Sequence, residues 1–288
     1  MLFNVATAED VRCAVVGHVE VVEFARVDRV PSRGEIIHTK ETWTQAAGGG
    51  AMAARELNRL AGDVTFFTAL GDDERGRAAE RELRALGIRV EAVYRNEPQR
   101  RCFVYLDDGG ERTITTIGAK LVPHARDPLA WDELNRIAGV YFCGGDAAAV
   151  REARRARALV ATARELPTLR EAAVRLDAVV HSARDESERY TPGDLDPPPD
   201  LVLTTEGAAG GRYVSGDAEG RWEAAPLPGP LADSYGAGDS FAAGVAYALG
   251  RGLPIDEALV VAARSAAAAL TVPGAGIRVP IEGLQSGG

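Results

Sequence analysis

Residues 233–252 read DSYGAGDSFAAGVAYALGRG, which places a glycine-rich turn, an aspartate and an apolar segment directly after one another. In the apolar segment, Phe241, Val245 and Leu249 recur at every fourth position, which is the spacing of a buried helix face. We therefore expect a helix over 239–250 that begins beside the glycine turn.

The turn Gly236-Ala237-Gly238 is suited to binding an anion. Backbone N–H groups at a helix N-terminus have no partner inside the helix, and glycine keeps side chains out of the anion's way. Asp239 follows directly and adds a carboxylate. Phosphoryl transfer to an alcohol needs both parts, because amides stabilise the charge on the moving group and a base takes the hydroxyl proton. The same residues also fit a plain helix cap by Asp239.

Composition limits the classes of function. The chain has 288 residues, of which 46% are hydrophobic and 26% are charged, as in an ordinary globular protein. Its net charge of -9 disfavours binding to nucleic acid or to an anionic membrane. The P-loop pattern G-x-x-x-x-G-K-S/T is absent, and no clean G-x-G-x-x-G follows the first strand-like run. Any phosphate must therefore be bound by another local device.

The cysteines, the opening residues and the apolar stretches of the sequence indicate the cellular compartment of the protein. Cys13, Cys102 and Cys143 fit neither a zinc pattern nor a disulfide framework, so we expect reduced thiols in or near the core. The opening MLFNVATAEDVRC lacks the basic and apolar regions of a signal peptide. No stretch approaches the ~20 apolar residues of a membrane span. We expect a cytoplasmic protein.

Strand-like runs alternate with helical patterns along most of the chain. Buried strands are expected at 12–17, 64–71, 139–145, 176–182 and 200–207. Helices are expected at 48–62, 72–87, 148–160, 239–250 and 256–272. This alternation predicts an α/β fold with a mostly parallel sheet and helices on both faces. Two regions, 19–45 and 98–117, break the rhythm with exposed strands, and the second is a hairpin around DDGG, so both are expected to leave the main sheet.

Five segments together resemble the PfkB-type carbohydrate kinases, the ribokinase-like family. DSYGAGDSFAAG is similar to the family's C-terminal signature, usually D-T-x-G-A-G-D. The other four occur in the family's order over nearly the whole chain: AGGGAMAARELNRLAG (47–62), TALGDDERGRAAERELRALGI (68–88), VLTTEGAAGGRYV (202–214) and SAAAALTVPGAG (265–276). The resemblance implies one ribokinase-like domain over 1–288, with a Rossmann-like core and a small β-sheet lid from 19–45 and 98–117.

The resemblance also implies an activity and a set of site residues. The activity is transfer of the γ-phosphoryl group of ATP, with Mg²⁺, to a hydroxyl of a sugar or sugar-like polyol. Asp239 would be the catalytic base, and Gly236, Ala237 and Gly238 would form the anion hole. Asp233 opens the loop where family members often bind a monovalent cation such as K⁺. The nucleotide side would comprise Thr205, Gly207, Gly210, Ala275 and Gly276.

The substrate side departs from the family pattern. The first strand usually ends G-x-x-N-x-D, but here Glu20 stands at the asparagine position and Val22 at the aspartate position. Glu20 or Glu23 could bind substrate instead, or the substrate is bound differently; we favour Glu20. Met52 stands where an asparagine usually contacts substrate. The remaining substrate-side candidates are Gly48, Gly49, Gly50 and Arg112.

The remaining expectations concern the magnesium site, alternative functions and the oligomeric state. Ser182 and Asp185 occupy the family's N-x-x-E positions, so Asp185 is the candidate for water-mediated contact with Mg²⁺. The alternatives are a nucleoside kinase of the same fold, with Trp43 or Phe24 as a platform for the base, and a sugar- or nucleotide-binding member without catalysis. The exposed edges of the lid strands also favour a homodimer through the lid.

Overall fold

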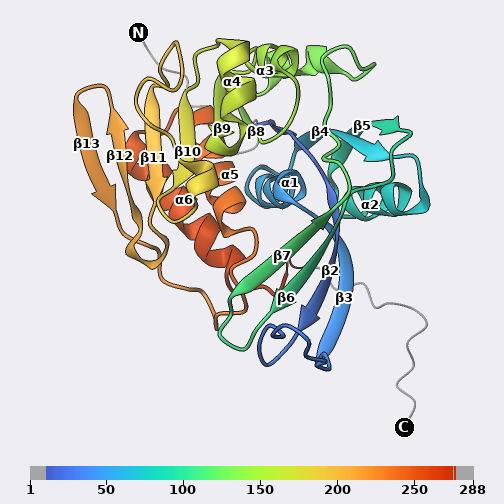
Figure 1. Cartoon of the computed structure of the whole chain (residues 1–288). Helices are drawn as coiled ribbons and strands as arrows, with labels where there is room; N and C mark the ends of the chain where they lie inside the picture. Colours follow the sequence, from blue (N-terminus) through green and yellow to red (C-terminus); the bar gives the residue numbers. More distant parts are fainter. Residues whose placement is uncertain (1–10, 275, 277–288) are drawn as a thin grey trace.

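In the described part of the chain, nine strands form one large sheet, and four others form a smaller sheet beside it (Figure 1). The computed structural model describes residues 11–274 and 276. The large sheet has the spatial order β13 (Ala218–Trp222), β12 (Gly211–Ser215), β11 (Leu201–Thr205), β10 (Ala178–Ser182), β9 (Ala158–Thr162), β8 (Gly139–Phe142), β1 (Cys13–Val16), β4 (Val64–Gly71) and β5 (Arg89–Arg95). Pairing is parallel from β11 to β5 and antiparallel at β12 and β13.

Helices cover both faces of the large sheet, as expected. Side chains alternate along β1, so that Cys13 and Val15 join one core cluster while Ala14 and Val16 join the other. The first cluster packs under α1 (Gly49–Ala61), α2 (Glu74–Ala85), α5 (Ala237–Gly250) and α6 (Ile255–Ala269). The second packs under α3 (Ala147–Ala153), α4 (Leu166–Ala172) and the short helix η2 (Trp131–Arg136). The predicted fold class is therefore confirmed.

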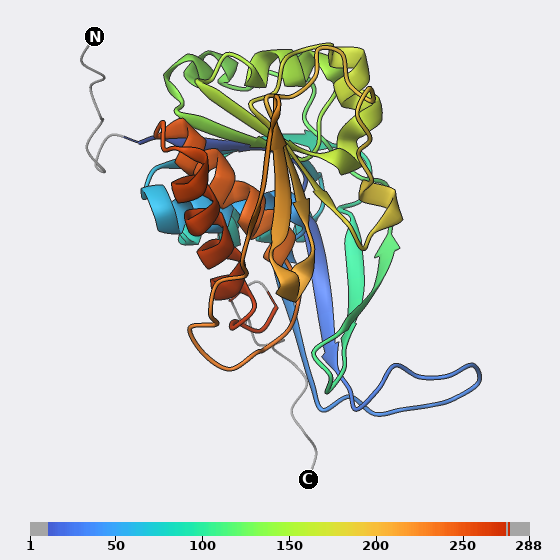
Figure 2. The same cartoon turned by 90° about the vertical axis from the view of Figure 1, so that its left-hand side faces the viewer.

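The small sheet has the order β3 (Glu41–Ala47), β2 (Glu20–Arg26), β6 (Arg101–Leu106) and β7 (Arg112–Ile117). β2 and β6 pair in parallel, whereas β3 and β7 are antiparallel edges. One face of this sheet packs on α1 and on the loop before α5 through a buried cluster that includes Phe24, Met52 and Tyr235. Both off-pattern regions thus leave the main sheet, and the β2–β3 connection projects as a long loop (Figure 2).

Some expected elements have other boundaries. The single helix expected over 148–160 is wrong: α3 ends at Ala153, and β9 begins at Ala158 between β8 and β10. Pairing on both sides outweighs the helical preference of its alanines and leucine. The strands β5, β12 and β13 and helix α4 were not expected. In the described part of the chain, no helix is long and apolar enough to cross a membrane.

Candidate active site

Asp239 lies in the first turn of α5, where the glycine turn meets the helix. Gly236 is the N-cap and has a φ of 74°, a left-handed conformation that favours glycine. Above the helix N-terminus, a Cβ placed on Gly238 would meet no atom within 4 Å. There is therefore open space beside the Asp239 carboxylate at the N-terminus of α5, where anion binding by the glycine turn stays a prediction.

Two neighbours define the position of the Asp239 carboxylate. Tyr141, in β8, donates a hydrogen bond from Oη to Asp239 Oδ1 over 3.1 Å. Gly49, the first residue of α1, approaches so closely that a Cβ there would lie 2.7 Å from the same Oδ1. Burial raises the pKa of Asp239, while the Tyr141 hydrogen bond and the positive charges of Arg164 and Arg112 act in the opposite direction. A carboxyl group with a raised pKa is a better proton acceptor.

The small sheet contacts the loop before the glycine turn through Arg112. From β7, Arg112 Nη1 donates to Ser234 O over 3.1 Å and to Ser234 Oγ over 2.8 Å. This contact ties the edge of the small sheet to the loop that carries the anion-binding turn. The predicted substrate-side residue Arg112 therefore lies against the loop that precedes Asp239.

Asp233 ties the same loop to the turn after α6. Its side chain is fully buried and accepts hydrogen bonds from Tyr235 N over 2.9 Å and from Gly274 N over 2.7 Å. Burial raises the pKa of Asp233. Among the described residues, no group of three or more His, Cys, Asp or Glu side chains could hold a metal ion. A monovalent-cation site at Asp233 stays a prediction.

The substrate side is less polar than in the family pattern. Val22 is fully buried, and Met52 packs against the turn so closely that its Cε would lie 2.3 Å from a Cβ on Gly236. Glu20 is buried in an ion pair with Arg100, with 2.8 Å between Oε1 and Nε, and it accepts a hydrogen bond from Cys102 Sγ over 3.0 Å. The two positions that usually bind hydroxyls are thus apolar, and Glu20 is already paired.

The glycines at the start of α1 bring backbone close to this region. Gly48 N donates to Tyr235 Oη over 3.1 Å, and Gly48 has a φ of 84°. Gly50 lies against His18, since a Cβ there would come within 2.6 Å of His18 O. A side chain at Gly50 would displace the loop after β1, and one at Gly48 would press against Glu20 at the start of β2.

The two aromatic residues considered as a nucleobase platform lie in the core. Phe24 and Trp43 stack on each other at 5.0 Å, and Phe24 also meets the Tyr235 ring edge-on. Trp43 is 2% exposed and Phe24 is completely buried. Their ring faces are used by packing within the protein.

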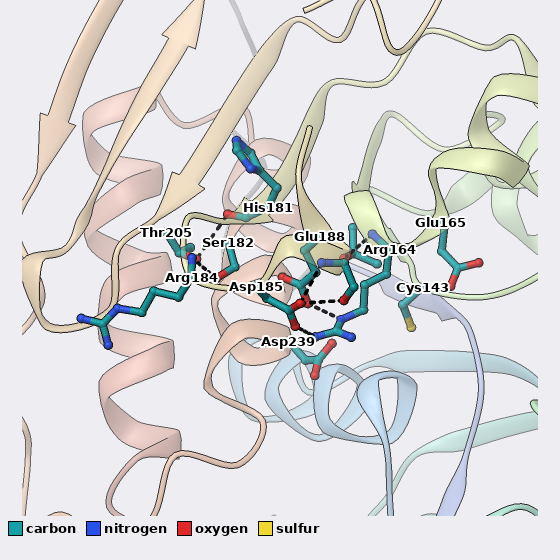
Figure 3. A network of polar contacts seen from close by, with 12 residues as sticks. Cys143, Arg164, Glu165, His181, Ser182, Arg184, Asp185, Glu188, Thr205 and Asp239 are labelled. Carbon is teal, nitrogen blue, oxygen red and sulfur yellow. Dashed lines mark hydrogen bonds and ion pairs between the residues drawn. The ribbon is translucent and has the colours of Figure 1, made fainter. Parts of the chain in front are cut away.

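A polar network next to Asp239 surrounds the predicted magnesium-side residue (Figure 3). Asp185 Oδ1 accepts hydrogen bonds from Ser187 N over 2.9 Å and from Ser187 Oγ over 2.6 Å, and Oδ2 pairs with Arg164 Nη2 over 2.7 Å. Arg164 also pairs with Glu188 through Nε. The Ser187 hydrogen bonds and the Arg164 charge hold the pKa of Asp185 below its usual range, whereas burial raises the pKa of Glu188.

The predicted nucleotide-side residues gather at the end of β11. Thr205 is the last residue of that strand and donates from Oγ1 to His181 O over 3.3 Å. Gly207 and Gly210 have φ values of 67° and 79° in the turn that follows. A Cβ on Gly210 would lie 2.1 Å from Trp222 O, so packing alone requires glycine there. Gly276 is exposed with a φ of 83°, and Ala275 lies outside the described residues.

Three residues of the site were not singled out from the sequence: Tyr141, Arg164 and Glu188. Tyr141 lies in an apolar strand, and Arg164 follows β9 in a stretch expected to follow a helix. Only the fold brings them to Asp239. Glu188 lies three residues after Asp185 in the sequence, so its charge was the one available signal.

Comparison with known proteins identifies the family of the chain. The chain matches the pfkB family of carbohydrate kinases over residues 11–179 and 159–282. It is a member of that family. This pfkB-family chain is 31% identical over 125 residues to the ATP-dependent ribose-1-phosphate kinase of Halopiger xanaduensis, covering 43% of the chain and 42% of the relative. It is 29% identical over 124 residues to the ribokinase of Arabidopsis thaliana, covering 42% and 31%.

A solved structure extends the likeness to nearly the whole fold. The structure of Arabidopsis thaliana ribokinase with ribose and ATP superposes with a TM-score of 0.68 at 20% identity, covering 92% of this chain and 96% of the other. At that identity the likeness shows the fold. In sequence, the matches span less than half of each curated relative.

Proposed function

We propose that this protein is an ATP-dependent kinase that transfers the γ-phosphoryl group to a hydroxyl of a sugar or sugar-like polyol. The observation that carries the proposal is the Asp239 carboxylate, which lies at the N-terminus of α5 beside the open Gly236–Gly238 turn. The two curated relatives are kinases of a phosphorylated sugar and, by name, of ribose, which supports the acceptor class.

The mechanism is a direct, in-line transfer. The acceptor oxygen forms a bond to the γ-phosphorus as the bond to the bridging oxygen breaks, and ADP leaves. The acceptor's proton passes to Asp239, whose raised pKa favours accepting it. Tyr141 keeps the carboxylate oriented, and the free amides of the glycine turn stabilise the negative charge on the moving group. The small sheet would act as a lid that limits hydrolysis of ATP by water.

Magnesium and a monovalent cation belong to the same proposal. A carboxylate has about four lone-pair positions, and Ser187 and Arg164 take three of those on Asp185. The remaining position fits a water-mediated contact with Mg²⁺, which would neutralise charge on the ATP phosphates. Asp233 is the candidate for K⁺.

The alternatives receive less support. A nucleoside kinase would need an aromatic surface for the base, and the ring faces of Phe24 and Trp43 are buried. A binding protein without catalysis would have no need of a half-buried carboxylate beside the glycine turn. A homodimer through the lid edges β3 and β7, a single domain over 1–288 and a cytoplasmic location remain predictions.

An ATP-consumption assay with a panel of acceptors tests the proposal. The panel contains free sugars, sugar phosphates, inositols, nucleosides and a no-acceptor control. We expect ADP formation that depends on one of the sugars or polyols, with a phosphorylated product. ADP formation only with nucleosides favours the alternative kinase. ATP binding without turnover on any acceptor contradicts the proposed catalysis.

A further inference from the structure

Arg164 is a cation fixed in place at the edge of the site. It lies in the short helix η3 (Ala163–Glu165), directly after β9. Its Nε pairs with Glu188, and its Nη2 pairs with Asp185 over 2.7 Å. Two carboxylates on separate positions of one guanidinium restrict its rotation, so the side chain is held in one orientation.

The other side of this guanidinium faces the catalytic carboxylate. In Figure 3 the Arg164 side chain points toward Asp239, with Asp185 and Glu188 on its other flank. The positive charge of Arg164 lowers the pKa of Asp239, whereas burial raises it. The view in Figure 3 thus places Arg164 and Asp239 at the same site.

The guanidinium has donors left for a ligand. Arginine carries five N–H donors, and within the described residues the hydrogen bonds of Arg164 use Nε and one N–H of Nη2. Nη1 donates to no described protein atom, and the side chain is 49% exposed. Exposed ion pairs contribute little to stability. Stability alone therefore does not explain why Asp185 and Glu188 fix the Arg164 guanidinium with Nη1 left free for a ligand.

We propose that Arg164 is a catalytic residue that binds the transferred γ-phosphoryl group through Nη1, opposite the amides of the Gly236–Gly238 turn. Asp185 and Glu188 position the guanidinium, and Asp239 takes the proton on the acceptor side. Charge on the phosphoryl oxygens grows or is redistributed in the transition state, so a fixed guanidinium stabilises it at no cost of reorganisation. This inference rests on the proposed kinase function.

Substitution of Arg164 tests the inference in the full-length protein. We expect Arg164→Ala to lower kcat by about 100-fold or more, and Arg164→Lys to recover only part, because lysine lacks the planar fork. Added guanidinium chloride at low millimolar concentration should raise the kcat of Arg164→Ala at least about tenfold, and should leave the parent unchanged. Arg170→Ala is the control, since Arg170 pairs with Asp194 on the surface of α4.

Nucleotide binding separates this inference from the proposed function. The parent should bind ATP more tightly than ADP, and Arg164→Ala should lose that preference while its affinity for ADP stays within about twofold. This measurement needs no acceptor, so it is informative even if no acceptor is turned over. If Arg164→Ala keeps both its kcat within threefold of the parent and its preference for ATP, the inference is wrong. Equal losses of ATP and ADP affinity in folded Arg164→Ala and Arg164→Lys would also overturn it.

Discussion

Tyr141 Oη lies 3.1 Å from Asp239 Oδ1, and this hydrogen bond joins the end of β8 to the first turn of α5. Tyr141 is 2% exposed, and burial together with the nearby Asp239 charge raises its pKa well above the ordinary value. The phenol therefore stays protonated and acts as a permanent donor to the carboxylate. It orients the base without competing for the acceptor's proton.

Tyr141→Phe should lower activity and shift its pH dependence. The hydrogen bond lowers the pKa of Asp239, so its loss raises that pKa further. A carboxyl group must be ionised to act as a base, and the acid limb of the kcat/KM profile should therefore move to higher pH. We expect kcat near neutral pH to fall about tenfold. Tyr213→Phe, in β12, should leave the profile unchanged, and an acid limb that does not move in Tyr141→Phe contradicts the role of Tyr141.

Gly49→Ala should separate activity from stability. The new Cβ would lie 2.7 Å from Asp239 Oδ1, so the carboxylate has to move away. A displacement of this size should lower kcat by about 10- to 100-fold. Gly49 has no positive φ, so alanine strains no backbone there, and the protein should stay folded with a melting temperature close to the parent's.

Gly229→Ala is the matched control for that substitution. A Cβ at Gly229 would meet Thr271 atoms at 3.8 and 4.0 Å, which is ordinary contact. Its kcat and melting temperature should equal those of the parent. Full activity of Gly49→Ala would mean that the Asp239 carboxylate is not required in this position.

Arg112→Ala should loosen the contact between the lid and the glycine turn. It removes both hydrogen bonds to Ser234, so we expect a several-fold higher KM for acceptor and more ATP hydrolysed per acceptor phosphorylated. The free energy of unfolding should change by less than about 1 kcal/mol, because the side chain is exposed. Arg29→Ala removes an exposed pair with Glu35 in the β2–β3 loop. It should leave the KM for acceptor and the ATP hydrolysed per acceptor phosphorylated at the parent's values.

The fold could be predicted largely from local patterns. The apolar run of β4 agrees with its predicted bounds of 64–71, and α1 is capped by glycines, Gly48 before it and Gly62 after it. The error at 148–160 has a physical cause: β9 reads ALVAT, which suits a helix as well as a strand fully buried between β8 and β10. Only its neighbours in the sheet decide between them.

Candidate site residues could be predicted from the sequence only where they lie together in one segment. The turn at Gly236 and the carboxylate of Asp239 are adjacent in sequence, so their pattern identified them. Tyr141 and Arg164 reach Asp239 from β8 and from the end of β9, and no spacing in the sequence relates them to it. The substrate side departs from the family pattern at Val22 and Met52, and both side chains are buried.

Turnover of Asp239→Asn is the most direct test of the kinase mechanism. Asparagine keeps the shape of the side chain and an oxygen that can accept from Tyr141, but it cannot take the acceptor's proton. With the acceptor found in the panel assay, we expect kcat to fall about 1,000-fold or more, while ATP binds within a few-fold of the parent. If folded Asp239→Asn phosphorylates the acceptor as fast as the parent, Asp239 is not the base and the proposed mechanism is wrong.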